Sequence, residues 1–203
     1  MTLSKNTSLT ITKNIIKAFT IASLISTANY AMANEFPSLI DDFSDAKNNS
    51  LGITRQFLDD TIAGGKTQTE ITIEAGKLQI KGEISPPRGQ PGWASSVLLL
   101  NAEGLPQDIS QFEGIKLLVK VDKGNISLSA NSTDVTNFDY HSALITVKPD
   151  GKFHQVNIPF NTMKRAWSEQ TQLNTATINS LSIVAFGVQK TAFNYAIDEV
   201  SFY

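Results

Sequence analysis

Apolar and polar residues alternate with a period of two over much of the chain, which is the pattern of strands with one buried and one exposed face. The clearest case is 115–121, which a polar turn at 122–125 joins to a second alternating segment at 126–130. Further turn signals, such as the KPDG sequence at 148–151, separate the other segments. The remaining strands that we predict are 71–73, 78–80, 97–100, 143–147, 153–158, 181–188 and 195–202.

Helical periodicity is scarce, and only 107–112 and 161–168 predict short helical turns. Roughly nine to eleven short strands separated by turns, with almost no helix, are typical of a β-sandwich. No long linker or internal repeat interrupts the pattern. We therefore predict an all-β fold, a single jelly-roll β-sandwich with very little helix that spans about residues 36–203.

The first 33 residues have the pattern of a secretory signal peptide. Three lysines precede a short apolar run at 18–25, an Ala31-Met32-Ala33 sequence follows the run, and no acidic residue occurs before Glu35. The apolar run is too short to cross about 30 Å of hydrocarbon. We expect cleavage after Ala33, which leaves a domain of residues 34–203 that is exported to a bacterial periplasm.

Composition excludes several classes of protein. Removing the 33 signal residues takes away three lysines and no acid, so the net charge of -2 becomes -5 and 170 residues remain. This acidic balance argues against a nucleic-acid partner. The absence of Cys excludes disulfides, thiolate metal ligation and a cysteine nucleophile. No later segment is long and apolar enough to predict a membrane span in the mature chain.

Five local sequences occur in an order that is characteristic of one protein family. They are IDDF at 40–43, DDTIAGGKT at 59–67, DISQFEGIKL at 108–117, GKFHQVNIPF at 151–160 and AIDEVSFY at 196–203. This series resembles the complex I intermediate-associated protein 30 family over essentially the whole mature chain. The resemblance implies a galactose-binding-like jelly roll related to carbohydrate-binding modules.

The second of these sequences matches the family's early motif, approximately Asp-Asp-x-x-Met-Gly-Gly-x-Ser. The matching residues are Asp59, Asp60, Gly64, Gly65 and Thr67, with Ala63 in place of Met and Thr67 in place of Ser. The GGKT end of the motif is similar to a phosphate loop, but Asp60 stands where that loop needs its first Gly. We expect instead a tight loop with glycines at positive φ, in which Asp60 or Thr67 binds backbone amides.

Acidic residues are paired along the chain at Asp41-Asp42 and Asp59-Asp60. Neighbouring strand residues point to opposite faces, so neither pair supplies the two carboxyls about 5–9.5 Å apart that glycoside hydrolysis needs. A small glycoside hydrolase is therefore the least supported function, and we expect no enzyme activity. Carbohydrate-binding modules commonly hold a structural calcium near their first and last strands. The resemblance thus raises one cofactor, a calcium bound by Asp41 or Asp42 with Asp198 or Glu199, against the alternative of solvated strand ends.

Three aromatic residues are candidates for ligand binding because a flat ring complements the apolar face of a sugar. Trp93 ends a Gly/Pro-rich segment at 86–93, where it is either a ligand platform or the start of a strand that covers the core. Trp167 lies beside Arg165, and Tyr140 is the third aromatic candidate. The predicted ligand-binding residues are therefore Trp93, Tyr140, Arg165 and Trp167.

The leading hypothesis is a non-catalytic exported binding or scaffold domain that recognises a glycan or a protein partner. The mitochondrial member of the family assists the assembly of respiratory complex I, so the alternative is an accessory factor for a membrane respiratory or envelope complex. Sugar binding predicts that Trp93 or Trp167 stands exposed in a groove. An assembly factor predicts a broad exposed apolar patch without a cleft. Nothing in the sequence indicates the oligomeric state.

Overall fold

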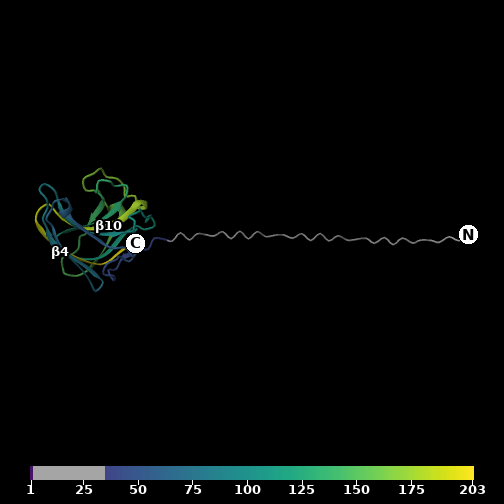
Figure 1. Ribbon diagram of the computed structural model, residues 1–203, viewed down its shortest axis with the longest axis horizontal. Helices are drawn as coiled ribbons and strands as arrows, with labels where there is room; N and C mark the ends of the chain where they lie inside the picture. Colours follow the sequence, from purple (N-terminus) through teal and green to yellow (C-terminus); the bar gives the residue numbers. More distant parts are fainter. Residues whose placement is uncertain (2–34) are drawn as a thin grey trace. The chain divides into compact units, whose positions relative to one another are not determined.

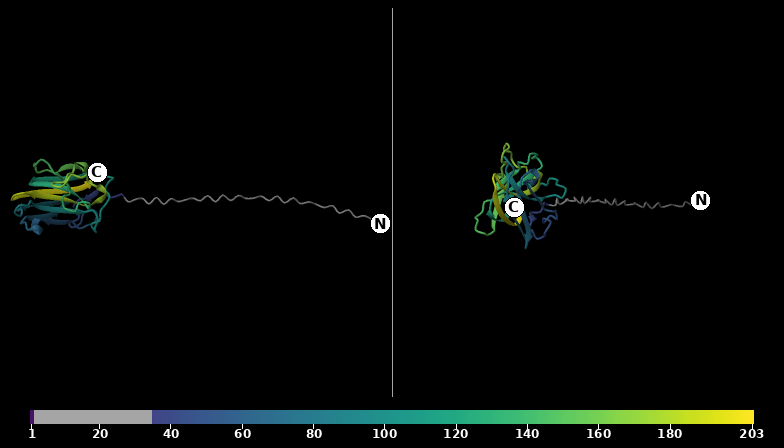
Figure 2. Two further views of the ribbon diagram at one scale, coloured as in Figure 1. Left: turned by 90° about the horizontal axis from the view of Figure 1, so that it is seen from above. Right: turned by 60° about the vertical axis from the view of Figure 1, so that its left-hand side comes forward.

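The computed structural model describes Met1 and residues 35–203. The predicted signal peptide and its cleavage point lie outside the described residues. Residues Glu35–Tyr203 form one compact unit, a β-sandwich of two antiparallel sheets (Figures 1 and 2). The prediction of an all-β sandwich is confirmed.

The first sheet has six strands in the order β3-β4-β11-β6-β9, with β1 paired to β11. The amide of Phe202 at the end of β11 donates to the carbonyl of Ser38 at 2.8 Å, so the two ends of the described unit lie side by side (Figure 1). The strands are β1 (Leu39–Asp41), β3 (Gln68–Glu74), β4 (Lys77–Ile84), β6 (Gly114–Lys123), β9 (His154–Pro159) and β11 (Thr191–Phe202).

The second sheet has five strands in the order β2-β5-β10-β7-β8. They are β2 (Gln56–Asp59), β5 (Gly92–Leu99), β7 (Asn125–Ser132), β8 (His141–Leu144) and β10 (Ile178–Gly187). Within residues 35–203 the helical content is three short 3₁₀ helices, η1 (Asp60–Ala63), η2 (Phe160–Thr162) and η3 (Thr175–Thr177). No helix among residues 35–203 has the length and apolar character needed to cross a membrane.

The core lies between the two sheets and is built by the alternating positions that the sequence pattern marks as apolar. Full burial of each such aliphatic side chain stabilises the fold by about 1.5–3 kcal/mol. Tyr195 of β11 is fully buried among them, and this burial raises the pKa of its phenol. Fully buried members from both sheets include Leu78, Leu98, Leu117, Val119, Leu128, Leu181, Ile183 and Ile197.

The structure corrects three details of the element prediction. Strand β8 covers 141–144 instead of 143–147, although Ile145 still donates its amide to the Ile126 carbonyl at 2.8 Å. The predicted helical turn at 161–168 is reduced to η2, because the amides of 166–168 bind a side chain instead of continuing a helix. The segment 107–112 contains no helix, since Asp108 accepts the Ser110 amide in a turn.

Candidate functional site

The outer face of the six-stranded sheet is an ordinary solvated surface. Its charged side chains form exposed ion pairs with N–O distances of 3.0–3.4 Å, of a kind that contributes little to stability. These pairs are Lys77–Asp198, Lys81–Glu70, Lys116–Glu199 and Lys120–Asp122. The charged side chains of this face are therefore explained by contact with water and with one another.

The outer face of the five-stranded sheet is different, because none of the side chains that point outward from its strands is charged. The strand register places these side chains in rows that cross the sheet. We call this surface the serine face. Its two central rows are Leu58-Ser95-Val184-Ser127-Leu144 and Gln56-Val97-Ser182-Ser129-Ser142, flanked by Trp93-Phe186-Asn125 and Leu99-Ser180-Asn131.

Several hydroxyls on the serine face are free to bind a ligand. Within the described chain, the side chains of Ser95, Ser127 and Ser129 make no hydrogen bond to protein, and all three are half-buried. Each hydroxyl offers one donor and two acceptor positions and carries no charge. The centre of this face therefore presents a neutral set of donors and acceptors on a floor of aliphatic side chains.

A buried amide at one end of the face organises the neighbouring serines. The Nδ2 of Asn131 donates to Ser180 Oγ at 3.0 Å and to Ser182 Oγ at 2.7 Å. The Oδ1 of Asn131 has no hydrogen-bond partner although the residue is only 5% exposed. A buried polar atom without a partner is costly, so this network is not explained by stability alone.

Trp93 is the second residue of β5 and faces outward on the serine face, between the buried residues Gly92 and Ala94. Its cross-strand neighbour is Phe186 of β10, which faces the same side of the sheet. Trp93 is thus the start of a strand, as one of the two sequence interpretations expected, but its side chain does not point into the core. It is half-buried.

The family loop motif fixes the position of Trp93. Asp60 is fully buried and accepts three hydrogen bonds, from Thr67 N at 3.1 Å, Thr67 Oγ1 at 2.7 Å and Trp93 N at 3.2 Å. Two glycines make room for this carboxylate. A Cβ on Gly65 would lie 2.1 Å from Asp60 Oδ1, and one on Gly92 would lie 2.6 Å from Oδ2.

The rest of the motif shapes the loop before β3. Asp59 caps η1 by accepting the Thr61 amide at 3.1 Å, and Gly64 ends η1 with a φ of 85°. Only one of the two motif glycines therefore needs a positive φ, while Gly65 is required by the close approach of Asp60. The motif is a structural anchor that ties η1 to the starts of β3 and β5.

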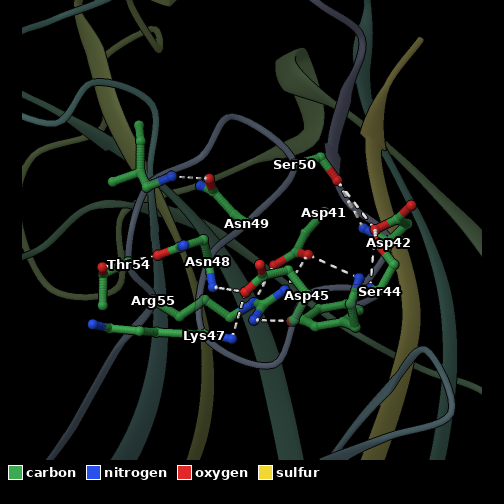
Figure 3. Close-up of polar contacts among 12 residues, drawn as sticks. Asp41, Asp42, Ser44, Asp45, Lys47, Asn48, Asn49, Ser50, Thr54 and Arg55 are labelled. Atoms are coloured by element: carbon green, nitrogen blue, oxygen red, sulfur yellow. Dashed lines mark hydrogen bonds and ion pairs between the residues drawn. The ribbon is translucent and has the colours of Figure 1, made fainter.

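At the end of β1, Asp41 forms a buried ion pair with Arg55 (Figure 3). Arg55 binds both carboxylate oxygens, Nε to Oδ2 at 2.6 Å and Nη2 to Oδ1 at 2.7 Å. The Phe43 amide also donates to Oδ1, at 2.9 Å, and the guanidinium lies 4.9 Å from the centre of the Phe43 ring. Arg55 Nη1 donates to the Asp45 carbonyl at 2.8 Å, which completes the cluster.

These contacts bear on the predicted calcium. Arg55 already supplies the positive charge that buried Asp41 needs, and a guanidinium in this place repels a second cation. No group of three or more His, Asp or Glu side chains within residues 35–203 gathers where it could hold a metal ion. As arranged, these acids do not fit one calcium site, and the calcium hypothesis stays a prediction. The other three acids have partners of their own: Asp42 with Ser44 and Ser50, Asp198 with Lys77, and Glu199 with Lys116.

The structure brings together the other three predicted ligand residues, but away from Trp93. Tyr140 lies in the loop before β8, and Arg165 and Trp167 lie in the segment that pairs with β8 through a Ser142–Lys164 bridge. Trp167 is 70% exposed, whereas Tyr140 is half-buried, which raises the pKa of its phenol. Three strand spacings of about 4.8 Å separate β8 from β5, so Trp93 and Trp167 cannot contact the same sugar ring.

Sequence reasoning missed two residues of this second region and, apart from Trp93, the residues of the serine face. Phe138 and Asp139 precede Tyr140, and an acid between two aromatic residues was the available signal. The serines carried no signal, because Ser at an outward strand position is ordinary until the register aligns it with others.

Comparisons with known proteins agree with the fold. The family model described as Complex I intermediate-associated protein 30 (CIA30) matches residues 43–197. No curated protein sequence matches the chain significantly.

Solved structures of carbohydrate-binding modules are similar to the chain. The Family 11 Carbohydrate-Binding Module of the cellulosomal cellulase Lic26A-Cel5E of Clostridium thermocellum has a TM-score of 0.58 and 18% identity, covering 82% of this chain and 93% of its own. The Clostridium thermocellum Family 11 module in complex with a β-1,3-1,4-mixed-linked tetrasaccharide has a TM-score of 0.56 and 16% identity, covering 81% and 94%. Part of an agarase, AgWH50C, has a TM-score of 0.52 and 10% identity, covering 80% of this chain and 24% of the agarase. At these identities the likeness shows the jelly-roll fold alone.

Proposed function

The chain belongs to the complex I intermediate-associated protein 30 family, and from this premise we propose that it is a non-catalytic binding domain whose serine face takes a neutral glycan. The observation that carries the proposal is the contrast between the two outer faces. One is covered with ion pairs, while the other has no charged side chain and keeps free hydroxyls in register.

The chemistry of the face suits a sugar chain. Serine hydroxyls donate to and accept from sugar hydroxyls, and the aliphatic floor contacts sugar C–H groups. Five strands spaced about 4.8 Å apart give a surface roughly 19 Å across, enough for several sugar rings. The tetrasaccharide bound by the Family 11 module is itself a neutral chain, which supports the same ligand class here.

A catalytic role has less support on this face. Glycoside hydrolysis needs an acid and a second carboxylate on either side of the sugar bond. The outward-facing side chains of the five described strands include no Asp or Glu. We therefore propose binding without bond cleavage, and product analysis after long incubation with each glycan would reveal any hydrolysis.

The test uses purified full-length protein and a panel of neutral oligosaccharides: a mixed-linkage β-1,3-1,4-glucan tetrasaccharide, cellohexaose, xylohexaose and agarohexaose. Alginate and polygalacturonate hexasaccharides are the anionic controls. Calorimetry is expected to show binding of at least one neutral member and of neither anionic one. Ser127→Glu, at the centre of the serine face, is expected to weaken binding at least tenfold. The matched variant Thr72→Glu, on β3 of the other sheet, leaves it unchanged.

A protein partner is the competing occupant, because the family's description names association with complex I intermediates. Two of the large apolar side chains that are exposed within residues 35–203, Leu58 and Leu144, lie on the serine face itself. The others are Leu39, Ile62, Leu105, Phe138, Trp167 and Val188. If the whole glycan panel fails and one membrane complex is retained by wild type but not by Ser127→Glu, the accessory-factor hypothesis replaces ours.

Export completes the proposal. The N-terminal lysines, short apolar run and Ala31-Met32-Ala33 sequence support a cleaved signal. Mass spectrometry of the protein from its native cells should find a mature chain that begins at Asn34. A chain that keeps residues 1–33 would contradict export by this route.

A further inference from the structure

Two neighbouring loops beside β8 hold large aromatic rings in water. Phe138 is 78% exposed and Trp167 is 70% exposed. Phe138 also has a φ of 61°, in the left-handed region that costs a bulky residue of order 1–3 kcal/mol. Gly or Asn would fit this backbone better, so neither burial nor conformational preference explains a phenylalanine here, and its one ring contact within residues 35–203 is an edge contact with Tyr140 at 6.4 Å between ring centres.

The backbone under Trp167 is fixed by one buried carboxylate. Asp139, whose side chain is 1% exposed, accepts from the amides of Ala166 at 2.7 Å, Trp167 at 3.0 Å and Ser168 at 2.6 Å. Burial alone would raise the pKa of Asp139, but the hydrogen bonds from Ser168 and these amides outweigh it and hold the pKa below its ordinary value. The anchor is therefore ionised at neutral pH.

Arg165 ties the two loops to each other. Its Nε donates to the Asp139 carbonyl at 3.1 Å and its Nη2 to Asn137 Oδ1 at 3.0 Å. Asn137 Nδ2 in turn donates to Ser168 Oγ at 2.9 Å. The guanidinium of Arg165 is thus used within the protein, and its effect is to hold the loops that carry both rings in one arrangement before any ligand arrives.

The size of the apolar area decides which ligand fits. A Trp and a Phe together offer at most about 500 Å², well below the roughly 800 Å² that each partner contributes to a stable protein interface. The loops that carry the rings also hold amides and a hydroxyl, from Asn137, Ser168 and Gln170, together with the exposed charged residues Lys164 and Glu169. Exposed aromatic rings near amide and hydroxyl groups suit a sugar ring, with its apolar face and its rim of hydroxyls.

We propose that Phe138 and Trp167 form a second binding site, separate from the serine face, for the apolar face of a sugar ring. We call it the aromatic loop site. The site borders the serine face at Ser142, whose backbone pairs with Lys164, but three strand spacings separate it from Trp93 at the other side of that face.

The test uses the two tryptophans as separate reporters. Trp93→Phe leaves Trp167 as the only indole, and Trp167→Phe leaves Trp93. Cellobiose, xylobiose and neoagarobiose are titrated into each full-length variant while emission is recorded. The proposal expects at least one disaccharide to change Trp167 emission saturably, with affinity lowered at least tenfold by Phe138→Ala and unchanged by Ser127→Glu. No Trp167 response up to 50 mM, or a response equal in Phe138→Ala, overturns it.

A second variant separates binding from folding. Phe138→Gly removes the ring and relieves the strained φ, so its melting temperature is expected to equal or exceed that of wild type while the Trp167 response is lost. A lower melting temperature would show that the ring is structural and would contradict the proposal. Emission of Trp93 in the Trp167→Phe variant reports ligand binding at the serine face independently, so failure of one site is distinguishable from failure of the other.

Discussion

At the scale of single residues, three buried acids with different partners determine the local architecture. Asp41 is neutralised by Arg55, Asp60 by a hydroxyl and two amides, and Asp139 mainly by three amides. In each case these partners replace the water molecules that the carboxylate loses on folding, since a buried charge without such partners is strongly destabilising. These acids hold loops in place through their hydrogen bonds.

Removal of Arg55 tests the first of these acids. Arg55→Ala leaves the carboxylate of Asp41 buried without its partner and is expected to lower the free energy of unfolding by about 3–5 kcal/mol. The exposed pair Lys77–Asp198 is the control, and Lys77→Ala should cost at most about 1 kcal/mol. Urea denaturation measures both. A cost for Arg55→Ala as small as the control's would show that Asp41 does not depend on the guanidinium.

Asp139 gives a dependence on pH. Its pKa is lower in the folded protein than its ordinary value of 3.8, so its stabilisation is complete well above pH 3.8 and is lost as the pH falls through the folded pKa. In the Trp93→Phe background, Asp139→Asn should be less stable than its parent by a constant amount above pH 5, with the difference shrinking below pH 3.8. A difference that persists undiminished at pH 2 would contradict an ionised anchor.

At the scale of elements, the sequence pattern predicted β6 and β7 most fully, because buried and more exposed positions alternate over much of each strand. β2 was missed, since its four residues contain only two apolar ones and one of those faces outward. The serine face could not be predicted from the sequence for another reason, because only the cross-strand register aligns Ser95, Ser127 and Ser129. The positive φ of Phe138 likewise cannot be predicted from the sequence. The structure reveals the aromatic loop site because it shows that the Phe138 ring is exposed next to the buried Asp139.

The glycines of the family motif provide a prediction at this scale. Gly65→Ala drives a methyl group into the Asp60 carboxylate and is expected to cost more than about 3 kcal/mol, since the backbone between η1 and β3 must move. The control Gly151→Ala, at a positive φ with no atom within 4 Å of the new methyl, should cost only about 1 kcal/mol. Equal costs in thermal or urea unfolding would show that close approach to Asp60 is not what Gly65 provides.

At the scale of the whole molecule, the sandwich separates stability from binding. The six-stranded sheet has a charged, ion-paired exterior, while the serine face leaves the hydroxyls of Ser95, Ser127 and Ser129 without protein partners. The aromatic loop site exposes the rings of Phe138 and Trp167, although the edge of the Phe138 ring contacts Tyr140. The core between the sheets does not depend on either surface. Surface variants on the serine face are therefore expected to change binding while leaving the fold intact.

The central claim is that the serine face binds a neutral glycan. The most direct measurement is a map of amide NMR shifts in full-length protein titrated with the neutral oligosaccharides of the panel. We predict that the shifts cluster on the central residues of β5, β7 and β10, around Ser95, Ser127 and Ser182. Shifts confined to the six-stranded sheet, or none at millimolar ligand for any member of the panel, would contradict the claim.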